Sequence, residues 1–279
     1  MRNMMTGDGW QLQGNAADAY ERYLVPAIFD AMARRLVAIA DVRPGDRVLD
    51  VACGTGVVAR AAGGRVGPTG SITGVDINPD MLAAASAAAA DVTSDIDWRL
   101  ADAGALPFDD DTFDVVLCEE AVQFFPDPVA VLREIRRVAT RDGTIAFSVL
   151  RPLAHNPVYA VFSRLLGQYA GDAAARMMAS PFAFGDAGAL RAAADEAGLT
   201  DVVVRIAVGE ERFPSVAEFV RREAASSPLA GPLAALDDVR LGALVAACED
   251  ALAAHVDDTG LVFHNETHVV TARPGRRPT

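Results

Sequence analysis

Lysine is absent from this chain of 279 residues, and all 25 basic side chains are arginine. This absence excludes a lysine Schiff base, a lysine general base and a Walker A phosphate-binding loop. Cysteine is scarce as well: Cys53, Cys118 and Cys248 are odd in number and lack the spacing of metal ligands. We therefore expect neither a disulfide framework nor a metal site.

Long apolar runs are also missing. No stretch approaches the roughly 18–20 residues of a membrane span, and the N-terminus lacks the basic and apolar regions of a signal peptide. Positive charge is in short supply, with a net charge of -13. Such a surface repels nucleic-acid backbones and anionic membranes. We expect a cytoplasmic protein whose partner is a small molecule, not a nucleic acid or a membrane.

What the chain does contain is an alternation of short apolar runs and helical stretches, which begins near residue 47. This alternation is typical of a parallel sheet with crossover helices. Strands are expected at 48–52, 71–77, 96–101, 113–118, 144–149, 201–208 and 261–272. Asn78 and Asp127, each followed by proline, predict helix starts. Two helical segments, about 151–184 and 215–256, interrupt the alternation and are expected to fold over the same edge of a doubly wound sheet.

The sharpest local feature is the glycine-rich turn at the end of the first strand, VLDVACGTG at 48–56. Its glycines let a ligand approach the backbone, and a helix N-terminus with free N–H groups follows. Gly54 to Ala59 also fits the dinucleotide pattern G-x-G-x-x-G/A. Asp50, inside the strand, opposes a dinucleotide, because a buried carboxylate needs donors to bind.

Two further acids follow the next two strands. Asp76 ends the second strand and could bind both ribose hydroxyls, whereas Asp102 follows the third and could accept a hydrogen bond from an exocyclic amine. A structural role for Asp102 is equally open. Because ligands of open α/β sheets bind at the carboxyl ends of strands, the three acids favour a cationic ligand with ribose and adenine over a pyrophosphate.

Five ordered stretches within 45–149 carry a family resemblance: 48–56, 74–82 (GVDINPDML), 102–108 (DAGALPF), 113–127 and 138–147. This segment resembles the class I S-adenosylmethionine-dependent methyltransferases, in particular the small-molecule and ubiquinone/menaquinone-type branch. The resemblance implies S-adenosylmethionine as cofactor and an α/β, Rossmann-like, seven-stranded doubly wound sheet with an antiparallel last strand and helical cap insertions. The core would comprise 41–150, 185–212 and 258–273, and the caps over the active site 1–40, 151–184 and 213–257.

The resemblance also implies roles at the cofactor. Asp50, Gly54 and Gly56 would face its methionine part, Asp76 would hold the ribose, Ile77 and Met81 would pack on the adenine or ribose, Asp102 and the Ala103 backbone would read the adenine edge, and Cys118, Glu119 and Tyr20 would lie near the methionine end. Ala52 replaces a glycine that is common in this family. An alanine is tolerated there if its φ is negative.

The acceptor side has fewer signals. Glu119 and Glu120 are adjacent, so on an extended segment they would point in opposite directions, leaving Glu120 as a candidate catalytic group facing the acceptor. His155, in the loop after the fifth strand, is a second candidate base, although a loop-stabilising role fits equally well. Substrate contacts are expected from the following residues, whose aromatic members fit a core role too: Tyr23, Gln123, Phe124, Phe162 and Phe182.

The sequence thus predicts methyl transfer from S-adenosylmethionine to O, N, S or C of a small, largely apolar or aromatic metabolite. Two alternatives stay open. One is an NAD-dependent oxidoreductase, which rests on the pattern at 54–59 alone. The other is a non-methylating S-adenosylmethionine-binding protein, because a fold does not fix the chemistry. The sequence also leaves a homodimer open.

Overall fold

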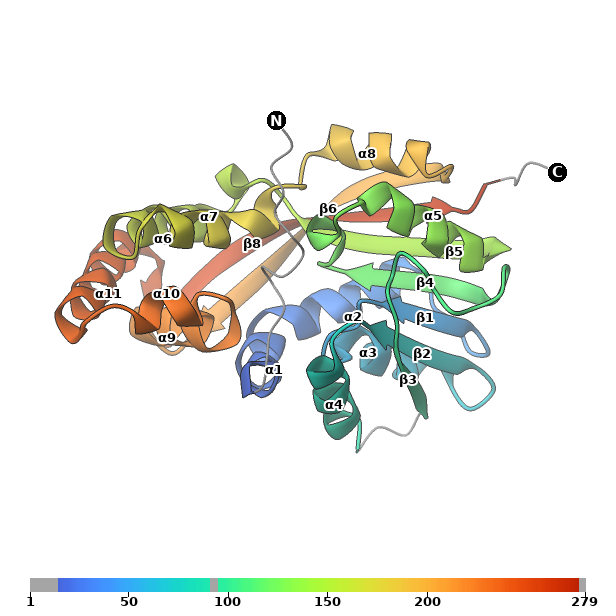
Figure 1. The fold of residues 1–279 in the computed structure, drawn as a ribbon, viewed down its shortest axis with the longest axis horizontal. Coiled ribbons are helices and arrows are strands. Elements are labelled where there is room, and N and C mark those ends of the chain that lie inside the picture. Colours follow the sequence, from blue (N-terminus) through green and yellow to red (C-terminus); the bar gives the residue numbers. More distant parts are fainter. Residues whose placement is uncertain (1–14, 91–94, 276–279) are drawn as a thin grey trace.

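The computed structural model describes residues 15–90 and 95–275. The predicted cap segment 1–40 therefore lies partly outside the described residues. The strands are β1 (Arg47–Val51), β2 (Ser71–Asp76), β3 (Ile96–Leu100), β4 (Phe113–Glu119), β5 (Ala139–Leu150), β6 (Thr200–Phe213), β7 (Val256–Asp257) and β8 (Gly260–Arg273). They form one sheet in the order β3-β2-β1-β4-β5-β8-β6, and the short β7 pairs with β8 (Figure 1).

Strand β8 runs antiparallel to its neighbours, and the remaining pairs are parallel. This confirms the predicted Rossmann-like fold with an antiparallel last strand, to which the structure adds β7. Two strands are longer than expected. Strand β5 begins at Ala139, which pairs with Phe113 ahead of the polar residues at which no strand was predicted. Strand β6 continues five residues beyond Val208 to Phe213.

Helices connect the strands. They are α1 (Asn15–Ala19), the π-helix η2 (Tyr20–Phe29), α2 (Asp30–Ile39), α3 (Val57–Val66), α4 (Pro79–Ala88), η3 (Val122–Phe124), α5 (Pro128–Val138), η4 (Leu153–His155), α6 (Pro157–Tyr169), α7 (Asp172–Ala179), η5 (Ser180–Phe182), α8 (Ala187–Glu196), α9 (Val216–Ser226), α10 (Ala230–Ala234), α11 (Asp238–Leu252) and η6 (Ala253–His255). Two predicted starts are capped as expected: the side chain of Asn78 accepts from the N–H of Asp80, and that of Asp127 from the N–H of Ala130.

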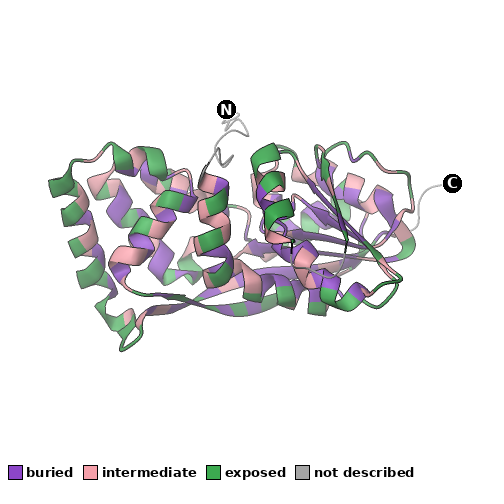
Figure 2. Ribbon diagram, turned by 90° about the horizontal axis from the view of Figure 1, so that it is seen from below, coloured by how far each residue is buried: buried purple, intermediate pink, exposed green. Residues whose placement is uncertain are grey.

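Two hydrophobic clusters fill the two faces of the sheet. One joins α5 and α8 to the strands through residues such as Leu132, Ile135 and Leu190. The other joins α2 and α3 through residues such as Leu36 and Val58. The inward sides of the helices are buried and the outward sides exposed, as Figure 2 shows. Helices therefore cover both faces of the sheet, and only the ends of its strands are available to form a site.

A third hydrophobic cluster lies beyond the end of the sheet. The pairing of β5 with β8 stops at Leu150 opposite Thr267, whereas the pairing of β6 with β8 continues to Phe213 opposite Leu261. This two-stranded ribbon projects into a lobe of α6, α7, α9, α10 and α11 (Figure 1). The segments that interrupt the strand–helix alternation thus meet around one ribbon, and part of η2 packs against them.

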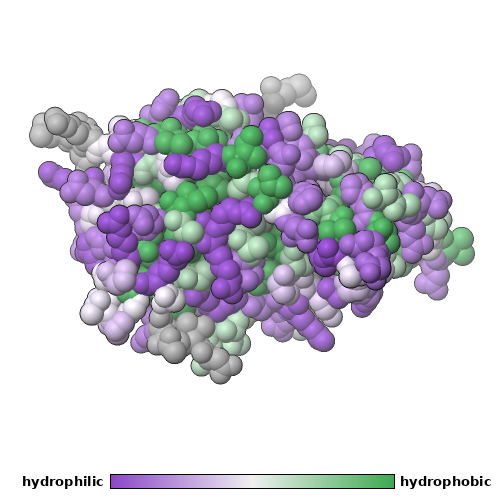
Figure 3. Space-filling view, turned by 180° about the vertical axis from the view of Figure 1, so that it is seen from behind, coloured by the Kyte–Doolittle hydropathy of each residue, from purple (hydrophilic) through white to green (hydrophobic). Residues whose placement is uncertain are grey.

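The surface mixes polar and apolar groups. On the face seen in Figure 3, apolar side chains lie among hydrophilic ones. Ile206 and Val208 on the edge strand β6 are among the exposed large apolar residues. A homodimer stays a prediction.

Within the described residues, no helix combines the length and apolarity needed to cross a bilayer.

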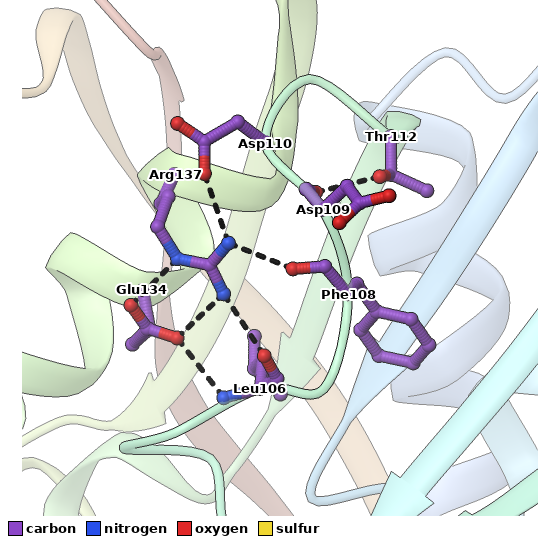
Figure 4. Close-up of polar contacts among 7 residues, drawn as sticks. All are labelled: Leu106, Phe108, Asp109, Asp110, Thr112, Glu134 and Arg137. Atoms are coloured by element: carbon purple, nitrogen blue, oxygen red, sulfur yellow. Dashed lines mark hydrogen bonds and ion pairs between the residues drawn. The ribbon is translucent and has the colours of Figure 1, made fainter.

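Arg137, in the last turn of α5, fixes the loop that follows β3 (Figure 4). Its guanidinium donates to the carbonyls of Leu106 and Phe108 at 2.9 and 2.7 Å, and it pairs with Glu134 and Asp110. Glu134 in turn accepts from the N–H of Leu106 at 2.9 Å. The loop that begins at Asp102 is therefore held against α5 by several charge-assisted hydrogen bonds.

We expect Arg137→Ala to lower the free energy of unfolding by about 2–3 kcal/mol. The change removes the charged donor that bonds the carbonyls of Leu106 and Phe108 and the carboxylate of Glu134. Arg133→Ala on the same helix is the control. Its side chain is half-exposed and bonds Glu196 at the surface, so the loss should stay below about 0.5 kcal/mol. Urea unfolding followed by circular dichroism measures both variants, and equal losses would contradict the role given to Arg137.

Candidate functional site

A cleft of about 890 Å³ opens at the carboxyl ends of β1, β2 and β4 and continues between the core and the cap lobe. It is lined by most of the residues singled out in the sequence: Tyr20, Asp50, Ala52, Gly54, Asp76, Ile77, Met81, Asp102, Ala103, Glu119, Glu120, Gln123, Phe124 and Phe182. The volume lies in the range of small-molecule sites.

Four predicted contacts do not line this cleft. Gly56 caps α3 with φ +81°, and a Cβ there would lie 2.3 Å from the Trp98 ring, so this glycine serves the packing of the turn. Cys118 is buried in the sheet core. Tyr23 packs between the guanidinium groups of Arg22 and Arg222. Phe162 lies in the core of the cap lobe, 5.0 Å from the ring of Phe219.

His155 does not reach the cleft either. It lines a separate pocket with His255 and His264, and its Nε2 lies 3.2 Å from a guanidinium nitrogen of Arg151. The loop after β5 turns away from the cleft at η4, so this position does not support the predicted base role. Across residues 15–90 and 95–275, no three His, Cys, Asp or Glu side chains are placed to hold a metal.

The turn after β1 departs from expectation at Ala52, whose φ is +55° instead of negative. The left-handed region is unfavourable for a residue with a Cβ. Gly54 also has a positive φ of 53°, and a Cβ at that position would meet no atom within 4 Å. The backbone at Gly54 is therefore open to a ligand, while Ala52 holds a conformation that suits glycine better.

Replacing Ala52 by glycine should raise the free energy of unfolding by about 1 kcal/mol, because the left-handed conformation costs alanine about 1–2 kcal/mol. Ala83→Gly is the matched control. Ala83 is exposed within α4, where glycine should lower stability by about 0.5–1 kcal/mol. Chemical unfolding of the two variants should give opposite signs. A loss in both would show that the turn does not strain Ala52.

Asp50 and Asp76 bind backbone donors of the turn. Asp50 is 1% exposed, and its Oδ2 accepts from the N–H of Ala59 at 3.0 Å. Burial raises the pKa of Asp50 to about 8, although this hydrogen bond opposes the shift. Asp76 accepts from Gly54 N–H at 2.8 Å and Asn78 N–H at 2.9 Å, yet burial raises its pKa as well. The sequence argument that a buried carboxylate needs donors holds for both acids.

Asp102 and Ala103 begin the loop that Arg137 fixes, and both residues line the cleft. One carboxylate oxygen of Asp102 accepts from the N–H of Gly104 at 2.8 Å, and the residue is exposed. Ala103 is buried against the sheet core. The local turn thus orients Asp102 toward the cleft mouth, next to Asp76 on the neighbouring strand end.

Glu119 and Glu120 both line the cleft, contrary to the expectation that they point in opposite directions. Glu120 has φ +48°, so the segment is not extended at that residue. Burial raises the pKa of Glu119 well above its ordinary range and that of Glu120 to about 7. Oε1 of each glutamate and Oε1 of Gln123 are buried and have no hydrogen-bond partner in the part of the chain that the structure describes. The end of β4 and the segment after it therefore place oxygen atoms in the cleft wall that can still accept hydrogen bonds from a ligand.

The raised pKa of Glu120 predicts a pH-dependent stability. The unfolded chain releases this proton near 4.5 and the folded protein near 7. Between these values the unfolded state binds fewer protons, so the free energy of unfolding falls as the pH rises. Between pH 5 and 7.5, the free energy of unfolding should therefore fall by about 2 kcal/mol less in Glu120→Gln than in the parent.

Urea unfolding at the two pH values tests this expectation. Glu249→Gln, on the exposed side of α11, is the control and should follow the parent. If Glu120→Gln lost as much stability as the parent, Glu120 would not be the buried acid that titrates in this range.

Sequence reasoning missed a second polar group at the cap end of the cleft, formed by Tyr159, Glu211, Glu223 and Ser226. A signal was present. Glu211 occupies an inward position of β6, between the buried Gly209 and Phe213. Glu223 lies four residues after Phe219 on the buried face of α9. A carboxyl group on an apolar face is unusual and marks a site worth attention.

The turn end of the cleft fits a ligand that carries donors and acceptors. Thr55 Oγ1 and Glu119 Oε1 are buried and find no hydrogen-bond partner among the described residues, and both residues line the cleft together with Gly54. A ligand amino group could bond the glutamate, and a ligand carboxylate the hydroxyl and turn N–H groups. Acids in this wall suit a positively charged ligand better than a diphosphate.

Comparisons with known proteins point the same way. Residues 49–147 match the family described as methyltransferase domain. The chain is 39% identical over 121 residues to nocamycin O-methyltransferase of Saccharothrix syringae, covering 43% of each protein. It is 38% identical over 157 residues to the ubiquinone/menaquinone biosynthesis C-methyltransferase UbiE of Xylella fastidiosa (strain M23), covering 53% of this chain and 62% of the relative. The chain thus spans about half the length of these curated relatives.

A solved protein of Bacillus halodurans C-125, described as a methyltransferase, has the same fold with a TM-score of 0.59 at 18% identity. The superposition covers 88% of this chain and 100% of that one. The matches thus assign residues 49–147 to a methyltransferase domain family, and the superposition confirms the predicted fold.

Proposed function

We propose that this chain, whose residues 49–147 match the methyltransferase domain family, is a class I methyltransferase that transfers a methyl group from S-adenosylmethionine to O, N, S or C of a small, largely apolar or aromatic metabolite. The observation that carries the proposal is one cleft that joins the glycine turn and its acids to apolar side chains of the cap. The attacking atom stays open, since the two named relatives are an O- and a C-methyltransferase.

At the turn end, Asp76 holds the ribose, Ile77 and Met81 pack on the nucleoside, and Asp102 accepts from the adenine amine. Glu119 and Tyr20 lie at the methionine end, beside Asp50. When bound, S-adenosylmethionine supplies a methyl group already activated by the positive charge on sulfur. The residues of the cleft therefore need to align the acceptor and exclude water more than to activate the donor.

At the cap end, apolar and aromatic side chains form the acceptor site, with Phe124, Met178 and Phe182 among those lining the cleft. The segments 15–40, 151–184 and 213–257 act as the cap that shields the reaction from water. Glu120 takes a proton from the acceptor at Oε1 when the acceptor needs to lose one. A pKa near 7 suits this role at neutral pH.

Calorimetric titration tests the cofactor site. We expect micromolar-range affinity for S-adenosylmethionine and its demethylated product. Asp76→Ala should weaken binding at least tenfold, since charged hydrogen bonds contribute about 1.5–3 kcal/mol each and Asp76 can accept two from a ribose. Asp102→Ala should weaken binding less, because Asp102 is exposed and accepts one from an amine.

NAD is the control ligand, and we expect no saturable binding of it. Saturable binding of NAD without any response to S-adenosylmethionine would favour an oxidoreductase. Cofactor binding without a methyl mass gain on any acceptor of a broad metabolite panel would favour a non-methylating protein. Unchanged affinity in Asp76→Ala would mean that the ribose is held elsewhere.

A further inference from the structure

The cap end of the cleft contains two carboxyl groups near one hydroxyl. Tyr159 donates its hydroxyl to Oε2 of Glu211 at 2.7 Å. Glu223 lies close to both groups, since its charge, after burial, raises the pKa of Tyr159 and of Glu211. Glu211 is 1% exposed and Glu223 is 4% exposed, and both line the cleft. The side-chain N–H of Asn265 also donates to Glu211. Two buried acids therefore face one ligand space from β6 and α9.

No positive charge of the described chain compensates this pair. Neither Glu211 nor Glu223 forms an ion pair within residues 15–90 and 95–275. The nearby arginines are engaged elsewhere: Arg222 bonds Glu218, and Arg212 bonds Asp257. Burying carboxylates without a cation is costly. The arrangement is thus unfavourable unless the acids stay protonated or a ligand brings the missing charge.

An independent observation indicates a ligand at the same place. Ser226 lies three residues after Glu223 on α9, so both side chains share one face of the helix. Ser226 is fully buried and lines the cleft, yet its Oγ has no hydrogen-bond partner within residues 15–90 and 95–275. Buried hydroxyls nearly always find a partner in folded proteins. An Oγ left unpaired beside two acids is what a polar ligand group would satisfy.

We propose that Glu211 and Glu223, with Tyr159 and Ser226, bind a protonated amino group of the acceptor, so that the methyl acceptor is an amine-bearing aromatic or apolar molecule. This inference rests on the proposed function, because the turn end of the cleft is given to the cofactor. An ammonium group offers three donors, which the two carboxylates and the Ser226 oxygen can accept. The rings of Tyr159 and Phe182, 5.3 Å apart, flank the space for its apolar part.

The two ends of the cleft then have different tasks. The acids at the ends of β1, β2 and β4 face the cofactor, whereas the Glu211–Glu223 pair lies on the cap and faces the acceptor. The amino group is a recognition group in this proposal. The binding mode does not depend on which atom of the acceptor receives the methyl group.

Matched pairs of amines and alcohols test the proposal on the full chain saturated with the demethylated cofactor product. The probes are 2-phenylethylamine with 2-phenylethanol and 3-phenylpropylamine with 3-phenylpropanol, titrated by calorimetry. At least one amine should bind tenfold or more tightly than its alcohol. Glu211→Gln and Glu223→Gln should each remove this preference and leave the affinity for the cofactor product within twofold of the parent.

Glu210→Gln is the control, because Glu210 neighbours Glu211 but faces solvent beside Arg212. It should keep the preference for the amine. Thermal unfolding verifies that each variant is folded. Equal binding of amines and alcohols by the parent, or a preference that survives in both glutamine variants, would overturn the proposal. If the cofactor product itself fails to bind, the proposed methyltransferase function fails instead, so the two failures are distinguishable.

Discussion

The pairing of β6 with β8 beyond the end of β5 is the constraint on which the cap and the acceptor side depend. From Val208 opposite Glu266 to Phe213 opposite Leu261, the two strands pair without β5 as a neighbour. An isolated ribbon is marginally stable, so it needs packing on both faces. The helices of the cap supply that packing. Phe213 and Phe263 stack on the ribbon, and Phe219 of α9 contacts both rings.

The same ribbon carries polar groups into the cleft. Because side chains alternate along a strand, a ribbon that presents Phe213 to the cap core also presents Glu211 on that face. Tyr159 of α6 and Glu223 of α9 reach this carboxyl group from two helices that the ribbon holds together. The cap core and the acid pair thus follow from one strand pairing, and a shift of one residue would send Glu211 to solvent.

The sheet and the turn were predictable because their signals are local. Apolar runs, helix caps at Asn78 and Asp127 and the glycines at 54 and 56 each act within a few residues. The positive φ of Ala52 and Glu120 was not predictable, because tertiary contacts impose it against local preference. His155 was misplaced because the direction of its loop depends on long-range contacts such as the ion pair between Arg151 and Glu266. Glu211 and Glu223 lie 12 residues apart in the sequence and come together only in the folded cap, beside Tyr159.

The charges of the cleft also decide which molecules it rejects. Burial raises the pKa values of five acids of the cleft, so each resists ionisation until a positive group is near: Asp50, Glu119, Glu120, Glu211 and Glu223. Beside Glu211 and Glu223, a carboxylate or phosphate of the acceptor would lack a basic side chain to pair with in the described chain, because Arg212 and Arg222 pair with other acids. A neutral apolar molecule would cover these acids and leave their hydrogen bonds unmade. Discrimination against both classes comes from the same buried atoms, since specificity rests as much on penalties to wrong ligands as on contacts with the right one.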